Sequence, residues 1–455
     1  MSSAAKPVPP PPDDSTERPA RNQLRTVLAS TVIGTTVEWY DFFLYGVAAG
    51  IIFNKQFFPS HDPTVATLLS FTTFALGFVA RPVGGLIFGH IGDRVGRKRT
   101  LVMTMLIMGV ATFLIGCLPT YGQIGVLAPI LLVVLRLLQG IAVGGEWGGA
   151  ILMSVEYAPR DKRSLFGSVP QMGLAFGLVL GTGVFALASA VMDDAAFNAW
   201  GWRVTFWLSL VLVIVGLVVR LKVMETPAFR TLQETEDTAV VPAKILLADR
   251  VNRRNLFLGM GARWVEGVAF NTWAVFSITY ATGTLKMQRE SALLGVMVAA
   301  IVLLAFIPIG GLIADRITAR RTFAIGAAVA ALAPLLAFPL MNTGNPWLNG
   351  LALVIVLGIL YGVLYGPEGA FFAELFPVKV RYSGISVVYQ MSGIVASGLT
   401  PLILTWLLDK AGGGVGLIVG YFLVTGLIST VCALLLRPVP DGVPLAAPAS
   451  PATAG

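Results

Sequence analysis

Ionisable side chains inside long apolar segments are the residues of this sequence best suited to do chemistry. A carboxylate or guanidinium at the centre of a bilayer costs at least about 2.5 to 3.5 kcal/mol, so each one needs a partner or a water-filled cavity. Five acids and three arginines interrupt apolar segments in this way, and they are the candidate functional residues: Glu38, Asp41, Glu146, Glu266, Glu368, Arg81, Arg136 and Arg263.

Two of the acids are close neighbours. Glu38 and Asp41 are three residues apart, and Tyr45 follows four residues after Asp41, so all three can project from one face of a helix. Two adjacent carboxylates out of water repel each other, which favours protonation of one of them. The pattern predicts a proton carrier, with Asp41 as the main site and Glu38 assisting. The alternative is that an arginine of a neighbouring helix neutralises one acid permanently.

Arg136 is the arginine expected to contact a ligand directly. A guanidinium can hold a carboxylate through two parallel hydrogen bonds, and the neighbouring Gly140 leaves room for a ligand. A salt bridge from Arg136 to Glu38 or Asp41 is the alternative, and the two roles could alternate. Polar side chains elsewhere in the apolar segments complete the expected ligand-binding set: Gln139, Tyr45, Gln171, Arg263 and Gln390. Arg263 could instead pair locally with Glu266, three residues on.

Three further charged residues are expected to act in gates rather than in ligand contact. Arg81 precedes Pro82, and a proline has no backbone N–H, so a carbonyl is left free inside the segment. Glu146 lies among four glycines near the end of its segment, and Glu368 is similarly placed beside Pro367.

The segments that carry these residues must be membrane-spanning helices. Of the 455 residues, 56% are hydrophobic and only 12% are charged, and the mean hydropathy is +0.79, which excludes a soluble enzyme. Apolar runs of about twenty residues can cross a hydrocarbon core as helices. We expect an all-α membrane protein with twelve spans near residues 27–53, 64–89, 100–118, 126–150, 165–189, 203–222, 255–281, 290–314, 321–340, 348–370, 383–407 and 415–436.

Metal, cofactor and nucleic-acid sites are not expected. The chain has two cysteines, both in apolar stretches, and two histidines that are far apart in the sequence. The net charge of +8 comes from basic residues in short loops. Of the lysines and arginines, 24 fall on the side of the N-terminus and four on the other side, so the positive-inside rule predicts that both termini are cytoplasmic.

The chain is expected to consist of two related halves. Two loop motifs, Gly89–Arg99 and Gly311–Arg321, share an Asp-Arg pair at an offset of 222 residues. Parallel halves of this kind form a recurrent membrane architecture with a ligand site between them. The expected organisation is a disordered tail, a six-helix bundle, a linker, a second six-helix bundle and a second disordered tail, at residues 1–26, 27–222, 223–254, 255–436 and 437–455.

These motifs resemble those of the major facilitator superfamily. Gly89–Arg99 looks like its signature loop, and Arg136–Gly140 resembles its R-x-x-Q-G motif. Other segments are similar to the bacterial metabolite:proton symporters, which include shikimate, oxoglutarate, citrate, dicarboxylate and proline/betaine carriers: Val37–Phe42, Arg81–Pro82, Gly144–Gly149 and Val380–Gly384. The resemblance covers roughly residues 27–436.

The resemblance implies a proton-coupled symporter in a bacterial inner membrane. It would import a small organic acid, such as a mono- or dicarboxylate or a shikimate-like acid, by alternating access. The proton gradient would drive import without a cofactor, and the chain would act as a monomer. In that family the loop acid and arginine brace helix ends, so latches are expected at Asp93, Arg94, Arg97, Asp315 and Arg316. A proline/betaine-type osmolyte symporter is the closest alternative, and a drug/proton antiporter is a more distant one.

Overall fold

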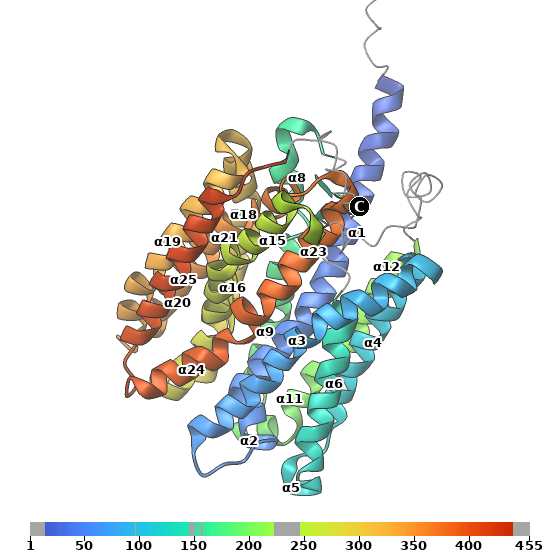
Figure 1. The fold of residues 1–455 in the computed structure, drawn as a ribbon. Coiled ribbons are helices and arrows are strands. Elements are labelled where there is room, and N and C mark those ends of the chain that lie inside the picture. The colour runs from blue at the N-terminus through green and yellow to red at the C-terminus, as the bar shows by residue number, and fades with distance from the viewer. Residues whose placement is uncertain are drawn as a thin grey trace, which may run out of the picture.

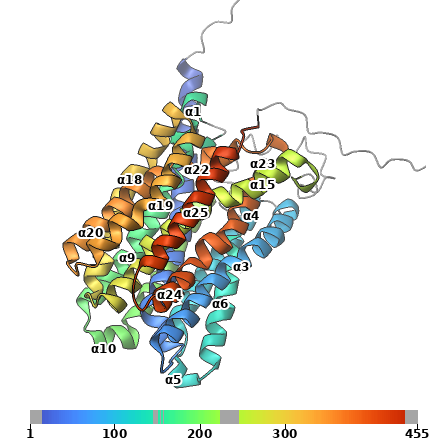
Figure 2. The same cartoon turned by 60° about the vertical axis from the view of Figure 1, so that its left-hand side comes forward.

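The part of the chain that the computed structural model describes is helical, with no strand within it. It comprises residues 14–95, 97–144, 151–152, 154–155, 158–222 and 246–439. Long helices run side by side, and those of the first and second halves form adjoining groups (Figures 1 and 2). Eight helical stretches are long and apolar enough to cross a membrane, and two shorter apolar helices accompany them among the described residues.

In the first half the long helices are separated by short turns. Short π-helices and short α-helices extend several of these long helices. The elements are α1 (Asp14–Ala48), η1 (Ala49–Phe53), α2 (Asn54–Gln56), α3 (Pro63–Val95), α4 (Arg97–Cys117), α5 (Tyr121–Ile124), α6 (Leu127–Val143), η2 (Arg160–Lys162), α8 (Arg163–Ser168), α9 (Met172–Val191), α10 (Asp194–Ala196), η3 (Phe197–Gly201), α11 (Trp202–Trp207) and α12 (Ser209–Lys222).

The second half repeats this plan with more interruptions. Wide turns break three of its spans near their middle. The elements are α15 (Arg250–Ala262), α16 (Trp264–Asn271), η4 (Thr272–Phe276), α17 (Ser277–Thr279), η5 (Tyr280–Thr284), α18 (Arg289–Ile317), α19 (Ala319–Met341), α20 (Pro346–Leu353), η6 (Val354–Tyr361), α21 (Gly362–Tyr365), α22 (Glu368–Ala373), α23 (Val378–Gly393), η7 (Ile394–Gly398), α24 (Thr400–Lys410) and α25 (Gly416–Leu435).

Two helices begin earlier than the sequence analysis expected. The expected tail ended at residue 26, but α1 starts at Asp14, so residues 14–26 are helical. This stretch contains good helix formers and adjoins an existing helix, so its extension needs no new nucleus. Similarly, α15 starts at Arg250, inside the expected linker, where the Asp249 carboxylate caps it by accepting from the Asn252 N–H. Most of the expected linker lies outside the described residues, and the domain division stays a prediction.

Glycines allow α3 and α6 to pack almost backbone to backbone. A Cβ atom added at Gly84 would lie 1.9 Å from the carbonyl oxygen of Ile141, and one at Gly140 would lie 2.2 Å from the carbonyl oxygen of Gly77. Small residues permit this approach between helices in a membrane. Gly140 therefore serves helix packing, and the room for a ligand that the sequence analysis expected beside it is filled by α3.

The two halves meet along two seams. In one, α9 of the first half packs against α18 of the second, and in the other α3 packs against α23, η7 and α24. Helices distant in sequence thus lie side by side in the middle of the molecule (Figure 1). Several candidate functional residues, among them Arg81, Gln171 and Gln390, lie along these seams.

Candidate functional site

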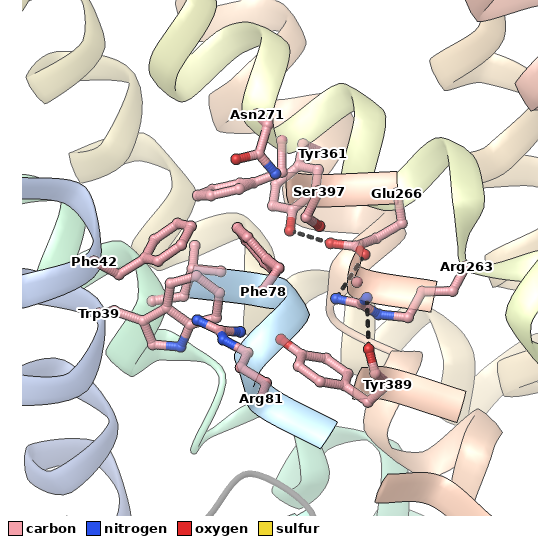
Figure 3. A pocket seen from close by; sticks show the side chains of 13 residues that line it. Trp39, Phe42, Phe78, Arg81, Arg263, Glu266, Asn271, Tyr361, Tyr389 and Ser397 are labelled. Atoms are coloured by element: carbon pink, nitrogen blue, oxygen red, sulfur yellow. Dashed lines mark hydrogen bonds and ion pairs between the residues drawn. The ribbon is translucent and has the colours of Figure 1, made fainter. Parts of the chain in front are cut away.

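A narrow cavity lies between the two halves, and we call it the central cavity. Helices α1, α3 and α9 line one side of the cavity. Arg263 and the elements α16, η6, α23 and η7 line the other side. Its lining combines aromatic rings with charged and amide side chains (Figure 3): Trp39, Phe42, Phe78, Arg81, Leu174, Arg263, Glu266, Phe270, Asn271, Tyr361, Tyr389, Gly393 and Ser397.

On the second-half side, one arginine holds two carboxylates. The Nη2 atom of Arg263 lies 3.2 Å from Oε2 of Glu266, and its Nε atom lies 2.9 Å from Oε1 of Glu368. Tyr361 donates from its hydroxyl to Oε1 of Glu266 at 2.6 Å. All three charged side chains are almost fully buried. We call Arg263, Glu266 and Glu368 the ion cluster.

Further contacts fix the Arg263 guanidinium in place. Its Nη1 atom donates to the hydroxyl of Ser392 at 3.2 Å and to the carbonyl of Tyr389 at 3.4 Å, and the guanidinium lies 3.7 Å from the centre of the Tyr389 ring. The local pair between Arg263 and Glu266 that the sequence predicted is confirmed. The carboxylate of Glu368 is held by Arg263, and its expected role in a gate stays a prediction.

Arg81 faces the ion cluster from the first half. Its guanidinium rests on the rings of Phe78 and Phe42, 4.5 and 5.3 Å from their centres, and it interacts electrostatically with Glu38. Arg81 was expected in a gate, but its side chain lines the central cavity.

A second cavity lies inside the first half, beside the central one. Its lining contains the two acids of α1, Arg136, and close-packed residues of α3 and α6: Glu38, Asp41, Phe42, Gly77, Arg81, Met108, Arg136, Gln139, Gly140 and Val143. Phe42 and Arg81 belong to both cavities, so they separate the acids from the central cavity.

Asp41 is buried and lacks hydrogen bonds. It is 2% exposed, and among the described residues neither carboxylate oxygen has a hydrogen-bond partner. Arg136 acts on it electrostatically, and Thr112 is a neighbour. The Thr112 hydroxyl donates to the Met108 carbonyl at 2.9 Å, so it does not donate to Asp41 at the same time. An ionised carboxylate in such a place is costly, and a protonated one is not.

Arg136 is held by its own bundle. It donates to Oε1 of Gln139 at 3.2 Å and to the Phe74 carbonyl at 3.4 Å, and it lies 4.1 Å from the centre of the Tyr45 ring. A Cβ atom at Gly77 would come within 2.4 Å of its Nε atom. The guanidinium therefore fills a slot in the first half and is not part of the central cavity lining.

The residues expected to assist Arg136 in ligand binding also turn inward. The Tyr45 hydroxyl donates to Thr73 at 2.6 Å, and Gln139 donates to Thr112 at 2.7 Å. Both side chains are buried. In this structure Tyr45 and Gln139 position Arg136 rather than face the central cavity.

Gln171 and Gln390 bridge the halves. The Gln171 amide donates to the carbonyls of Tyr365 and Gly366, both at 3.0 Å, and the Gln390 amide donates to the carbonyl of Gly144 at 2.9 Å. Gly144 and Gly366 are 222 residues apart, the same offset that relates the two loop motifs. The two contacts are thus counterparts under the internal duplication. These amides, expected to bind a ligand, are used in closing the seam.

Asp315 contacts the first half of the chain, and its role as a latch stays a prediction. Its carboxylate accepts from the backbone N–H groups of Ser164 and Leu165, at 2.8 and 3.0 Å, at the start of α8. The neighbouring Arg316 is exposed. The side chains of Asp93, Arg94 and Arg97, and the whole of Glu146, lie outside the described residues, so their gating roles stay predictions.

The other end of the same seam is closed by different residues. Arg289 lies 3.1 Å from a carboxylate oxygen of Asp194 and donates to the Ser189 hydroxyl at 3.3 Å, while Ser189 donates to Glu290 at 2.5 Å. The Arg289 guanidinium also lies 4.6 Å from the centre of the Phe197 ring. The α9–α18 seam is therefore closed at both ends.

The sequence analysis missed several cavity residues. Tyr361, Tyr389, Phe78, Phe270 and Asn271 line the central cavity, but each is an uncharged residue in an apolar span. Aromatic residues are common in apolar spans, so nothing in the sequence distinguishes those that line a cavity. A polar residue such as Asn271, isolated within an apolar span, was the one detectable sign.

Comparisons with known proteins agree with this architecture. A family model described as "Sugar (and other) transporter" matches residues 27–245, and one described as "Major Facilitator Superfamily" matches residues 258–453. An inner membrane metabolite transport protein of Escherichia coli (strain K12) is 42% identical, over 91% of this chain and 94% of its own. The chain belongs to the major facilitator superfamily. The resemblance drawn from the sequence motifs is confirmed.

Other relatives differ in the compound that they are named for. The shikimate transporter of Escherichia coli (strain K12) is 38% identical, over 94% of this chain and 97% of its own. The proline/betaine transporter of the same strain is 33% identical, over 86% of this chain and 79% of its own. The family consists of transporters, so this chain is a multi-pass membrane transporter.

Solved structures share the fold. The xylose transporter of E. coli in a partially occluded inward-open conformation has a TM-score of 0.69 at 16% identity, and the match covers 91% of this chain and 97% of that one. A D-xylose-proton symporter gives the same TM-score at 17% identity, with 91% and 98% covered. The expected fold of twelve helices in two six-helix bundles is therefore confirmed.

Proposed function

We propose that this transporter is a symporter that brings a small organic acid into the cell together with protons, across a bacterial inner membrane, by alternating access. One observation carries the proposal. A cavity between the two halves is lined on its first-half side by a buried arginine, Arg81, which rests on aromatic rings. A desolvated guanidinium at a cavity is suited to a carboxylate, which can accept two parallel hydrogen bonds from it.

Arg81 therefore takes the role that the sequence analysis gave to Arg136. Arg136 is occupied by Gln139 and a backbone carbonyl, and Arg263 is occupied by two carboxylates. Arg81 rests on two aromatic rings and interacts electrostatically with Glu38. Arg136 does not line the central cavity, so Arg81 is the arginine to which a carboxylate in that cavity would bind.

Asp41 is the proposed proton carrier. The buried charges of the described residues comprise three arginines and four acids, Glu38, Asp41, Glu266 and Glu368. One carboxylate is in excess, and Asp41 is the acid whose two oxygens both lack hydrogen bonds among the described residues. Because buried charges need compensation, the excess acid is the natural place for a proton.

Arg81 also supplies a route for coupling. It lines both cavities, so it lies between the substrate position and the acids of α1. Arg81 interacts with Glu38, so a substrate carboxylate that neutralises Arg81 would remove a stabilising positive charge from the pair of acids on α1. The effect is reciprocal, because a proton taken up by this pair would leave Arg81 more available to the substrate.

Proton coupling solves an electrostatic problem for import of an acid. Each negative charge entering a negative cell is opposed by about 2.3 kcal/mol per 100 mV of membrane potential, and a proton cancels that charge. The distribution of basic loops supports cytoplasmic termini, with the Asp315 end of the seam facing the cytoplasm. Both sides of the central cavity come from one chain, which supports function as a monomer.

A proline/betaine-type osmolyte is the second candidate. The aromatic rings around the central cavity favour it, because ring faces attract quaternary ammonium groups. Six aromatic residues line the cavity: Trp39, Phe42, Phe78, Phe270, Tyr361 and Tyr389. Competition between glycine betaine and organic acids for uptake separates the two candidates.

The direct test is uptake by the purified chain in liposomes with an imposed pH gradient. We expect accumulation of organic acids only when the inside is alkaline. Arg81→Gln should reduce uptake of the acid at least about tenfold, because a charge-assisted bond to a carboxylate contributes roughly 1.5 to 3 kcal/mol. Arg250→Gln, which removes an exposed arginine at the start of α15, is the matched control. Uptake that ignores the pH gradient would refute proton coupling, and normal uptake by Arg81→Gln would refute the role of Arg81.

A further inference from the structure

Two polar groups that line the central cavity are not used in hydrogen bonds among the described residues. The Oδ1 atom of Asn271 and the Nε1 atom of Trp39 are buried and have no hydrogen-bond partner within the described structure. Asn271 is 1% exposed and Trp39 is 6% exposed. Buried polar atoms are normally paired, and leaving one unpaired costs its full desolvation, so such atoms in a cavity indicate a ligand group that completes them.

The orientation of the Asn271 amide is fixed by its own helix. Its Nδ2 atom donates to the carbonyl of Gly267 at 3.0 Å, one turn earlier in α16. The nitrogen is thereby used, and the oxygen is left to accept a hydrogen bond. Asn271 and Arg81 lie on opposite sides of the cavity, with the rings of Phe42 and Phe78 between them (Figure 3).

We propose that the substrate is a hydroxylated carboxylate, and that Asn271 selects for its hydroxyl group. This inference rests on the proposed function. The carboxylate binds Arg81, with the Trp39 indole N–H as a further donor, and a hydroxyl at the other end of the carbon skeleton donates to Oδ1 of Asn271. The aromatic rings between these positions pack against the carbon skeleton.

A hydroxyl fits this position better than an ammonium group. Arg263 contacts both carboxylates of the ion cluster, and Tyr361 donates to Oε1 of Glu266, so these carboxylates already have partners within the fold. A neutral amide oxygen needs a donor but no charge. The methyl groups of glycine betaine provide no N–H or O–H, so betaine would leave Oδ1 unsatisfied.

Matched pairs of acids test the selection. Liposomes containing the full chain would be assayed for uptake, driven by a pH gradient, of lactate against propionate and of quinate against cyclohexanecarboxylate. In the pair whose hydroxylated acid is transported faster, we expect that acid to be taken up roughly 10- to 100-fold more efficiently than its deoxy partner. The reason is that the deoxy acid leaves a buried acceptor unpaired. Asn271→Leu should bring that ratio close to one by impairing uptake of the hydroxylated acid.

Asn349→Leu is the matched control. Asn349 is also fully buried, and both of its amide atoms lack partners in the described structure, but it lies on α20 and is not part of the central cavity lining. The control should leave the ratio unchanged even if it alters the amount of folded protein. A ratio unchanged in Asn271→Leu would overturn the inference.

If Asn271→Leu does not fold, uptake by the wild-type chain alone can test the selection for a hydroxyl group. Equal uptake of hydroxylated and deoxy acids, or stronger competition by proline or glycine betaine than by any hydroxylated acid, would overturn the selection for a hydroxyl. Equal uptake would leave proton-coupled acid transport intact. If none of the acids responds to the pH gradient, the proposed function itself fails, so the two failures are distinguishable.

Discussion

Asp41 and Arg81 have complementary positions within the first half. Arg81 lines the central cavity, whereas Asp41 lies in the adjoining cavity beside Glu38 and Arg136. A carrier that couples two ligands needs sites that are separate but that interact electrostatically. Because the two positions are separate, a change that disables the proposed proton site should leave the proposed substrate site intact.

Replacement of Asp41 by asparagine tests this separation. Asp41→Asn mimics the protonated acid permanently, so we expect the variant to bind substrate and exchange it across the membrane but to lose uphill accumulation at least about tenfold. Counterflow measures exchange, and uptake under a pH gradient measures accumulation. Asp409→Asn, the same change at an exposed position at the end of α24, should behave as wild type. Loss of both activities in Asp41→Asn would contradict the separation.

At the level of elements, the packing of α3 against α6 determines where Arg81 and Arg136 point. Glycines at the contact bring the backbones together, and a Cβ atom added at Gly144 would lie only 2.0 Å from the carbonyl oxygen of Arg81. This close contact restrains the rotation of α3 and α6 and thereby the directions in which Arg81 and Arg136 point.

A single methyl group should disturb this contact. Gly84→Ala places a Cβ atom 1.9 Å from the carbonyl oxygen of Ile141, and backbone cannot move aside cheaply. We expect a loss of about 1 to 3 kcal/mol in stability, typical of overpacking, seen as a lower thermal midpoint in detergent. Gly420→Ala on α25 is the matched control, because its Cβ atom would meet nothing within 4 Å. Equal midpoints for the two variants would contradict the close contact.

The sequence predicted elements better than it predicted side-chain partners. The length of the apolar runs predicts the spans, and the separation of three residues predicts the pair between Arg263 and Glu266. Both are local properties of the chain. The link from Arg263 to Glu368 joins residues 105 positions apart. It depends on which helices adjoin and how each is rotated, which no local pattern encodes. For the same reason no local pattern shows that Arg81 lines the central cavity and Arg136 does not.

At the scale of the whole molecule, the α9–α18 seam is closed by two latches of unequal strength. At one end Asp315 accepts two backbone hydrogen bonds, and at the other end Arg289 pairs with Asp194, whose side chain is 83% exposed. Hydrogen bonds to a charged group contribute about 1.5 to 3 kcal/mol, whereas exposed ion pairs typically contribute 0.2 to 1 kcal/mol. The Arg289 end should therefore open more readily than the Asp315 end.

Spin labels on α9 and α18 near the Arg289 end, and on α8 and α18 near the Asp315 end, can measure this asymmetry as distance distributions. Arg289→Gln should raise the population open at its own end by only about two- to fivefold, because the ion pair that it removes involves the exposed Asp194, and glutamine keeps a donor for Ser189. Asp315→Asn retains one acceptor oxygen and loses the charge, so the population open at the Asp315 end should rise about tenfold or more. Lys410→Gln, an exposed change at the end of α24, should move neither distance. Alternating access further requires that each variant opens one end while the other stays closed, so simultaneous widening at both ends would refute a rocking motion of two rigid halves.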